Sequence, residues 1–343
     1  MSSLLIPFGK FYGWVMDARN ASYDRGIFRV HDLGARTVSV GNLTTGGTGK
    51  TPLVAMIGEC LAERGETVCI LTRGYGRKNV GERVVVSDGK SVLADAETGG
   101  DEPVELARKL IGKAIVIADA NRVSAGIWAK EQFGVTAFIL DDGFQHRRAK
   151  RDLDIVCIDA TNPCGNGRIL PAGNLRESFR SLNRADAIVL TRTNLVDSTH
   201  AIIERLKKRN PTAPIFQMSI TITAFVKLED FLNDQPAAEN GPNFSSPFGF
   251  CGLGNPENFR KQLEEEHFQL TGFHAFSDHK KYTHADIDAI ETEAMQTHSD
   301  SLLTTSKDAE KLGEFGFKLP VYVVESKPKI EDPEAFKDLL VSS

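Results

Sequence analysis

The stretch "VSVGNLTTGGTGKTPLVAMIGECLAERGE" (residues 38–66) decides the fold. The β-branched run at residues 37–40 predicts a buried strand, and apolar residues recur at helical spacing from Leu53 until Gly65. Between them lies a glycine-rich turn. The backbone N–H groups of such a turn, together with the N-terminus of the following helix, form an anion site. The order of strand, glycine-rich turn and helix therefore predicts a phosphate-binding loop.

The residues of this turn predict a nucleoside triphosphate as the ligand. Lys50 is expected to reach the outer phosphates, and the hydroxyl of Thr51 is expected to contact Mg²⁺. The turn departs from the usual phosphate-loop pattern at Thr44, where the pattern has glycine. A purely structural turn is the alternative. The residues expected to bind the phosphates are Thr44, Thr45, Gly46, Gly47, Thr48, Gly49, Lys50 and Thr51.

The composition is that of an ordinary soluble protein. The chain has 343 residues, of which 41% are hydrophobic and 25% charged, enough for two domains. The 41 Lys and Arg residues against 46 Asp and Glu give a net charge of −5, so no basic excess indicates a nucleic-acid partner. The five cysteines lack C-x-x-C spacing and are expected to be reduced. The histidines lack the spacing of a zinc site.

Strand and helix patterns alternate along the first part of the chain. Short β-branched runs predict an α/β fold with a parallel sheet and helices on both faces, with strands at residues 67–72, 83–87, 114–118, 135–140, 153–158 and 187–191. After Ser219 the pattern changes to an alternating, hairpin-like segment and then to a polar stretch rich in turn residues. We therefore expect four regions: an N-terminal helical segment (1–30), a phosphate-loop domain (31–219), a hairpin linker (220–247) and a smaller C-terminal α/β domain (248–343).

The N-terminal segment is rich in aromatic and aliphatic residues. It is too short, and too often interrupted by Pro7, Lys10 and Gly13, to span a bilayer. It also lacks the basic start and cleavage site of a signal peptide. Two alternatives remain open from the residues alone: a helix in the membrane interface with nearby arginines at the headgroups, or a helix packed on its own domain.

Several polar residues are candidates for chemistry beside the phosphate loop. Asp141 and Asp142 end an apolar strand, where a carboxylate can hold Mg²⁺ directly or through water, although the pair could simply begin a turn. Asp101 opens a predicted helix, where it could be only an N-cap or could accept a proton near the γ-phosphate. The motif "TRGYGR" supplies Arg73, Tyr75 and Arg77 for an anionic or sugar-like ligand, or for any solvated loop.

Taken together, the motifs resemble those of the tetraacyldisaccharide 4'-kinase family. The resemblance extends over nearly the whole chain and rests on "TTGGTGKTP", "TRGYGR", "GGDEP", "DDGFQHRRAKRDLDI", "PAGNLRES", "FCGLGNPENF", "FSDHKKYT" and "TTSKDAEKL", in this order. It implies a kinase that uses ATP and Mg²⁺ to phosphorylate a lipid disaccharide in lipid A biosynthesis, at the cytoplasmic face of the bacterial inner membrane. It also favours contact between the N-terminal helix and the membrane surface.

The resemblance further implies a role for individual residues. Lys50 and Thr51 match residues that bind ATP phosphates and Mg²⁺, and Asp141 and Asp142 match the acidic pair that supports the metal. Asp101 matches the proposed general base, and His279 matches a histidine that orients or tunes it. The positions that surround the lipid disaccharide are matched by Arg73, Tyr75, Arg122, Gln145, His146 and Arg176.

A membrane-associated switch ATPase or a GTPase is the alternative function. The switch ATPases carry an early lysine in the phosphate loop, where this chain has Thr45. A GTPase would need a guanine-reading N-K-x-D motif after a strand of the first domain, and none stands there. The sequence determines neither the acyl chains of the substrate nor the oligomeric state, for which a monomer is the default expectation.

Overall fold

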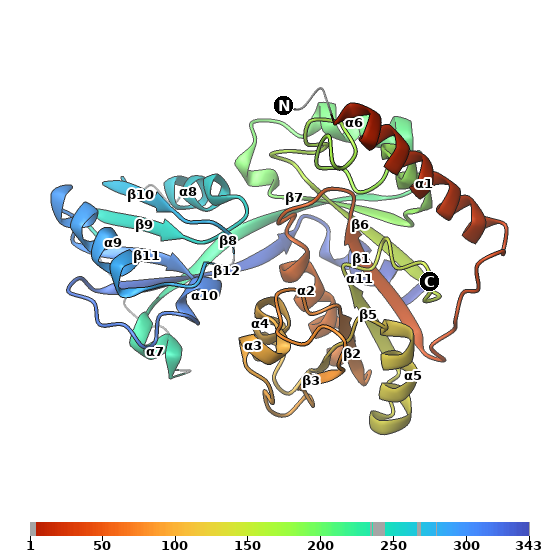
Figure 1. The fold of residues 1–343 in the computed structure, drawn as a ribbon, viewed down its shortest axis with the longest axis horizontal. Coiled ribbons are helices and arrows are strands. Elements are labelled where there is room, and N and C mark those ends of the chain that lie inside the picture. Colours follow the sequence, from red (N-terminus) through yellow and green to blue (C-terminus); the bar gives the residue numbers. More distant parts are fainter. Residues whose placement is uncertain (1–4, 234, 236–243, 266–268, 279, 343) are drawn as a thin grey trace. The chain divides into compact units, whose positions relative to one another are not determined.

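The structure is a computed structural model of the chain. It describes residues 5–233, 235, 244–265, 269–278 and 280–342. The chain forms two compact units, of which the first comprises Met1–Ser219 and Ile330–Ser343 and the second Ile220–Lys329 (Figure 1). Strands β8 (Ile215–Lys227) and β12 (Val321–Ile330) carry the chain from one unit to the other and back.

The first unit is built on a mostly parallel sheet, which confirms the predicted α/β fold. Its strand order is β8-β7-β6-β1-β5-β2-β4-β3. The strands are β1 (Arg36–Asn42), β2 (Val68–Thr72), β3 (Val84–Ser87), β4 (Ala114–Ala118), β5 (Ala137–Asp141), β6 (Leu153–Asp159) and β7 (Ala187–Thr191). Only β3 departs from the parallel arrangement, because it pairs with β4 in the antiparallel direction at the sheet edge. A single antiparallel edge strand is common in sheets of this kind.

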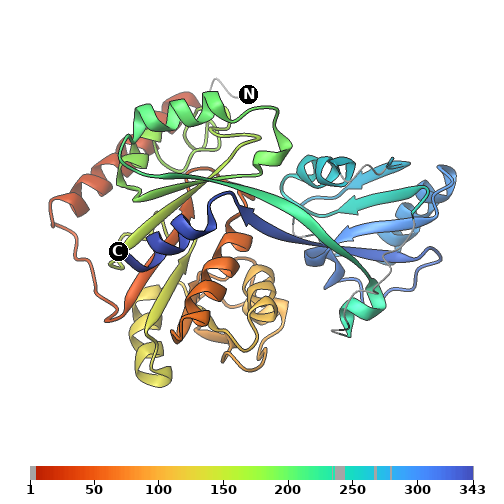
Figure 2. The ribbon, with the colours of Figure 1, turned by 180° about the vertical axis from the view of Figure 1, so that it is seen from behind.

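Helices cover both faces of this sheet (Figures 1 and 2). In β5 Ile139 approaches α2, whereas its neighbours Phe138 and Leu140 pack in a buried cluster with residues of α5. A strand buried on both faces needs apolar residues at every position, which explains the unbroken apolar runs in the sequence. The helical elements are α1 (Ile6–Asp24), α2 (Lys50–Glu63), α3 (Ala96–Gly99), α4 (Asp101–Lys109), α5 (Arg122–Phe133), the 3₁₀ helices Phe179–Arg184 and Thr193–Leu195, α6 (His200–Arg209) and α11 (Pro333–Ser342).

The second unit is a smaller α/β body. Strands β9 (Pro247–Cys251), β10 (Gly272–Ala275) and β11 (Ser301–Thr305) join β12 in parallel pairs, and β8 lies next to β12. The helices are α7 (Leu228–Leu232), α8 (Pro256–Glu265), α9 (His284–Gln296) and α10 (Ser306–Ala309). Buried Asp308 accepts hydrogen bonds from the Gly252 N–H and the Tyr282 hydroxyl, so one carboxylate joins three of the sequence motifs.

Two of the expected boundaries differ from the structure. Residues 330–343, expected in the C-terminal domain, belong to the first unit, because Phe336 packs edge-to-face on Phe216 and Arg36 donates to the carbonyl of Val341. Residues 220–227, expected in a hairpin linker, continue strand β8 beside the distant strand β12. An alternating pattern predicts a strand but does not identify its partner. Residues 236–243 of the polar stretch lie outside the described residues.

Candidate active site

The phosphate loop connects the end of β1 to the start of α2, as predicted. Asn42 ends β1, and its side-chain amide donates to the Thr44 carbonyl at 2.7 Å and to the Thr48 hydroxyl at 2.9 Å. Gly49 precedes α2 with a φ of +75°, a left-handed conformation in which a larger residue would be strained. A Cβ at Gly49 would also lie 3.3 Å from Thr191. The loop therefore needs glycine at this position for two independent reasons.

Neighbouring segments fix the loop from outside. The Thr45 N–H donates to the carbonyl of Asn174 at 2.8 Å, and the Thr191 hydroxyl donates to the carbonyl of Thr48 at 2.9 Å. The guanidinium of Arg192 donates to the carbonyl of Gly47 at 2.8 Å. Three hydrogen bonds from neighbouring segments thus hold the loop in place.

The acidic pair lies beside this loop and is surrounded by cations. Asp141 is the last residue of β5, and Asp142 follows it with a φ of +51°. The Asp142 carboxylate lies 3.6 Å from Nζ of Lys50 and 2.6 Å from Nη1 of Arg176. Arg122 donates to the backbone carbonyl of Asp142 at 3.0 Å. The fold therefore brings together Arg122 and three residues, Lys50, Asp142 and Arg176, that the sequence placed in three separate motifs.

The two carboxylates of the pair have opposite electrostatic environments. Burial, together with the nearby charges of Glu102 and Asp142, raises the pKa of Asp141 to about 6, against the opposing effects of Lys50 and Arg122. Burial also raises the pKa of Asp142, but Lys50 and Arg176 outweigh this effect and hold it below its usual value. Asp142 is therefore firmly ionised, whereas Asp141 gains a proton readily. The contribution of Glu102 was not foreseen from the sequence.

The residues present fit Mg²⁺ bound together with a nucleotide. The Oδ1 atom of Asp142 is buried and accepts no hydrogen bond within the described chain. No group of three or more His, Cys, Asp or Glu side chains among the described residues could hold a metal by itself. Mg²⁺ typically takes one or two carboxylates and completes its shell with phosphate and water. Thr51, Asp141 and Asp142 are therefore suitable ligands only when a phosphate ligand is also present.

The expected substrate residues border the acidic pair at several points. The segment that follows β5, here called the post-β5 loop (residues 142–150), contains Gln145 and His146. Gln145 donates to the carbonyl of Asn42 at 2.9 Å and accepts from Arg176 at 3.4 Å. Burial and the positive charge of Arg122 lower the pKa of His146 to about 3. His146 is therefore neutral at physiological pH, and its Nε2 atom is buried with no hydrogen-bond partner among the described residues.

The "TRGYGR" motif divides into two parts. Arg73 donates to the Tyr75 hydroxyl at 3.0 Å and lies over the Tyr75 ring, and both side chains are exposed. Arg77, in contrast, is buried and donates to the carbonyls of Ala118 and Val80 at 2.9 and 2.8 Å. Arg73 and Tyr75 are therefore available to a ligand, whereas Arg77 holds the turn in place.

Asp101 and His279 are the two residues expected to act on the acceptor hydroxyl, and the described residues include only Asp101. Asp101 is the first residue of α4 and follows Gly100, whose φ is +96°. The positive end of the helix dipole stabilises a carboxylate at this position. His279 lies outside the described residues.

Two residues with clear structural roles, Arg192 and Glu177, were not predicted from the sequence. Arg192 has a left-handed φ of +57° and binds both Asp159 and the phosphate loop. Its only sequence signal is its position directly after strand β7. Glu177 lies inside the motif "PAGNLRES" but has no spacing that marks a buried carboxylate.

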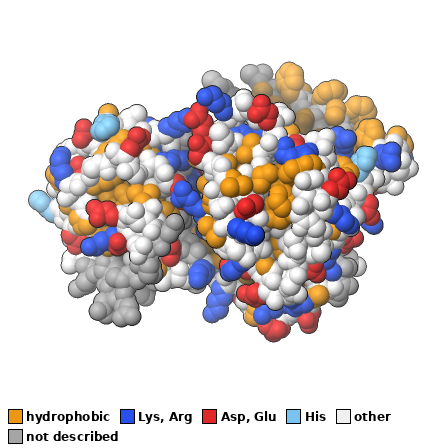
Figure 3. All heavy atoms as spheres, turned by 90° about the horizontal axis from the view of Figure 1, so that it is seen from below, with side chains coloured by type: hydrophobic (Ala, Val, Ile, Leu, Met, Phe, Trp, Pro, Cys, Tyr) orange, Lys and Arg blue, Asp and Glu red, His pale blue; other side chains and the backbone are white. Residues whose placement is uncertain are grey.

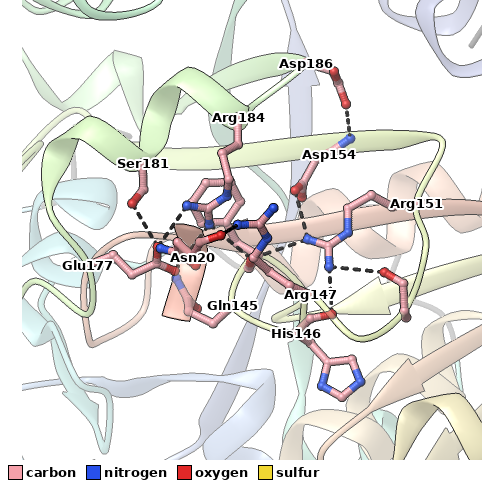
Figure 4. A network of polar contacts seen from close by, with 12 residues as sticks. Asn20, Gln145, His146, Arg147, Arg151, Asp154, Glu177, Ser181, Arg184 and Asp186 are labelled. Atoms are coloured by element: carbon pink, nitrogen blue, oxygen red, sulfur yellow. Dashed lines mark hydrogen bonds and ion pairs between the residues drawn. The ribbon is translucent and has the colours of Figure 1, made fainter. Parts of the chain in front are cut away.

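Glu177 is the centre of a buried polar network (Figure 4). Its side chain is 0% exposed and accepts from Asn20 at 2.6 Å, Ser181 at 2.8 Å and Arg184 at 2.9 Å. Burial raises the pKa of Glu177, but the charge of Arg184 and these hydrogen bonds lower it more, so it lies below its usual value. The guanidinium of Arg184 also lies over the ring of Phe144, 4.1 Å from its centre.

This network predicts a pH-dependent loss of stability in Glu177→Gln. At pH 7 we expect the free energy of unfolding to fall by about 3 kcal/mol, because the variant leaves Arg184 buried without a counter-charge. The lowered pKa stabilises the parent chain above pH of about 4.3, the unfolded value, and this stabilisation is lost as pH falls through the folded value. Urea unfolding at pH 7 and pH 4 measures the difference, which should shrink at the lower pH. An equal loss at both values would mean that the charge of Glu177 has no role.

Helix α1 packs on its own domain along one side and exposes aromatic side chains on another. Gly9 and Gly13 are buried, in close contact with Ile169. On another side of the helix, Phe8, Phe11 and Trp14 are 63%, 64% and 67% exposed. No helix in the described part of the chain is both long and apolar enough to cross a membrane.

Elsewhere the surface is mixed in character. On the face seen in Figure 3, basic and acidic side chains are interspersed, and hydrophobic side chains gather between them. The near balance of charges in the sequence is thus also visible on this face.

Comparison with known proteins identifies the family. The whole chain, residues 1–343, matches the family described as tetraacyldisaccharide-1-P 4'-kinase. It is 38% identical to the tetraacyldisaccharide 4'-kinase of Desulfotalea psychrophila, over 98% of this chain and 95% of that protein. The corresponding kinase of Geobacter metallireducens is 37% identical, over 94% of this chain and 92% of that protein.

A solved structure gives the same result. LpxK from Aquifex aeolicus, crystallised in complex with ATP, superposes with a TM-score of 0.75 at 31% identity, and the match covers 99% of this chain and 98% of that one. This likeness extends over the whole chain, as the family match does. The chain belongs to the tetraacyldisaccharide 4'-kinase family.

Proposed function

We propose that this protein transfers the γ-phosphoryl group of ATP to the 4'-hydroxyl of a tetraacyl glucosamine disaccharide 1-phosphate, at the cytoplasmic face of the inner membrane. The observation that carries the proposal is the cluster of Lys50, Arg122 and Arg176 around Asp142, directly beside the phosphate loop. Such a cluster combines a cationic phosphate site with a carboxylate that stays ionised.

The chemistry requires stabilisation of negative charge on the group in transfer. Lys50 begins α2 and is largely buried, so its ammonium acts where water screens charge poorly. Mg²⁺ supplies further neutralisation of the phosphate oxygens, and Thr51, Asp141 and Asp142 would hold it. Asp142 also holds the guanidinium of Arg176, which keeps this cation beside the reaction centre.

The acceptor side of the reaction is assigned by family membership and by position. Asp101, the first residue of α4, accepts the proton of the attacking hydroxyl. His279 orients or tunes this carboxylate. Residues around the acidic pair and on the adjacent turn bind the disaccharide and its existing phosphate, namely Arg73, Tyr75, Arg122, Gln145, His146 and Arg176.

The lipid character of the acceptor accounts for the exposed face of α1. Phe8, Phe11 and Trp14 expose aromatic surface that is unfavourable in water and favourable at the level of lipid headgroups. A kinase that meets its acyl chains at a membrane surface needs such a face. The protein therefore binds the membrane peripherally through α1.

We expect ATP consumption to depend on the lipid acceptor. With purified protein, Mg²⁺ and ATP, the release of ADP should be slow until the disaccharide is added in mixed micelles, and labelled phosphate should then appear on the lipid. The reason is that the positioned hydroxyl, and not water, is the acceptor in the assembled site. Steady ATP or GTP hydrolysis without lipid, and no labelled lipid, would instead support a switch ATPase or GTPase.

A further inference from the structure

Helix α1 has a second face, which carries polar side chains and is distinct from the exposed aromatic face. Arg19, Asn20 and Tyr23 lie near its C-terminal end, and Asn20 and Tyr23 are buried. The side chains of these residues are directed toward the first unit and not toward the exposed aromatic face, as their contacts below establish.

The polar face of α1 contacts the post-β5 loop directly. Arg19 donates to the carbonyl of Gln145 at 3.0 Å. In the opposite direction, Arg147 donates to the carbonyl of Asn20 at 2.9 Å and to the carboxylate of Asp24 at 2.6 Å. The guanidinium groups of Arg19 and Arg147 both lie 5.2 Å from the centre of the Tyr23 ring. Hydrogen bonds and cation–π contacts therefore hold helix and loop together in both directions.

A second set of contacts reaches the same loop through Glu177. Asn20 donates to the Glu177 carboxylate, which also binds Arg184. Arg184 in turn lies over the ring of Phe144, in the post-β5 loop. Asn20 thus ties α1 to this buried network, so a displacement of α1 would disturb Glu177 as well as the loop.

The post-β5 loop leads from α1 to the reaction centre. Gln145, whose carbonyl accepts from Arg19, donates through its side chain to Asn42, the last residue of β1. The same side chain accepts from Arg176, which binds Asp142 at 2.6 Å. Only one residue, Gln145, separates α1 from the groups that hold Asp142 and the start of the phosphate loop.

We propose that the polar face of α1 is a positioning element of the reaction centre: Arg19, together with the contacts of Arg147, holds Gln145 and thereby Asp142 and Arg176 in place. The inference rests on the proposed kinase function. One helix then has two roles: its aromatic face binds the membrane, and its polar face sets the rate of phosphoryl transfer.

The test compares variants of the two faces in two assays. Arg19→Ala should lower kcat about tenfold with the lipid acceptor in mixed micelles, and should raise the Mg²⁺ concentration for half-maximal rate several-fold, because outer contacts of metal-holding groups typically have effects of this size. Sedimentation with phosphatidylethanolamine and phosphatidylglycerol vesicles should be unchanged. Trp14→Ala should give the reverse pattern, with weaker sedimentation and an unchanged Mg²⁺ requirement.

Two further variants separate positioning from a general loss of stability. Arg19→Lys keeps a donor within reach of the Gln145 carbonyl and should restore most of kcat, whereas Arg19→Gln should not. Arg64→Ala removes an exposed arginine at the end of α2 and should change neither quantity. Thermal unfolding of every variant identifies any that do not fold. If Arg19→Ala does not fold, kcat and the Mg²⁺ requirement are compared between Arg19→Lys and Arg19→Gln instead.

The possible results are distinct. If the parent chain labels the lipid and Arg19→Ala keeps its kcat and Mg²⁺ requirement, the positioning role is wrong while the kinase function stands. A parallel loss of vesicle binding and kcat in Arg19→Ala would also overturn it, since α1 would then act only as an anchor. If the parent chain does not label the lipid at all, it is the proposed function that fails.

Discussion

Lys50→Ala should lower kcat about 1,000-fold and leave the fold intact. The Lys50 ammonium is largely buried at the start of α2, 3.6 Å from Asp142, where it can neutralise charge on the transferred group with little screening by water. The fold should survive, because Arg176 still pairs with Asp142 at 2.6 Å. The measurement is the rate of label transfer from ATP to the lipid disaccharide at saturating concentrations of both.

A matched control tests whether the position of this lysine is what counts. Lys113 forms an ion pair with Glu59 at 2.7 Å, but both side chains are exposed, so Lys113→Ala should change neither kcat nor stability by a measurable amount. Thermal unfolding of Lys50→Ala should stay close to that of the parent. Near-normal kcat in this variant would refute the phosphate-loop reading of residues 44–51.

Asp141→Asn and Asp142→Asn should both abolish most of the activity but have opposite effects on stability. At pH 8 we expect Asp142→Asn to lose about 3 kcal/mol of unfolding free energy, because Lys50 and Arg176 are left beside it without their counter-charge. Asp141→Asn should be neutral or more stable than the parent by up to about 3 kcal/mol, because it removes a charge that burial and Glu102 disfavour. The readouts are urea unfolding and label transfer.

The free energies of unfolding of the two variants, relative to that of the parent, should change with pH in opposite directions. The raised pKa of Asp141, about 6, means that the folded parent binds a proton more tightly than the unfolded chain, so ionisation of Asp141 costs stability as pH rises toward and beyond 6. The advantage of Asp141→Asn should therefore appear in this window and vanish near pH 4. The lowered pKa of Asp142 predicts a deficit of Asp142→Asn that is present at neutral pH and disappears in acid. Equal stability effects in both variants would show that the two environments do not differ.

The phosphate loop and the strands were predictable from the sequence because their signals are local. The order of strand, glycine-rich turn and helix depends on hydrogen bonds and sterics between residues close in the chain, and the structure has β1 and α2 on either side of residues 43–49. The strands predicted at residues 67–72, 114–118 and 187–191 differ from β2, β4 and β7 by at most one residue. Asp141 ends β5 as expected, because apolar runs buried on both faces stop where the chain leaves the sheet.

The tertiary structure decided everything that depends on distant partners. Sequence alternation predicted a hairpin linker at residues 220–247 and not a strand beside the distant β12, and nothing local assigns residues 330–343 to the first unit. The pKa values of the acidic pair also depend on partners that are distant in the sequence. Asp141 and Asp142 are adjacent and chemically alike, yet their pKa values move in opposite directions because Lys50 and Arg176 reach only one of them closely. Burial and Coulomb interactions depend on distance in space, and distance in space between remote residues is what folding creates.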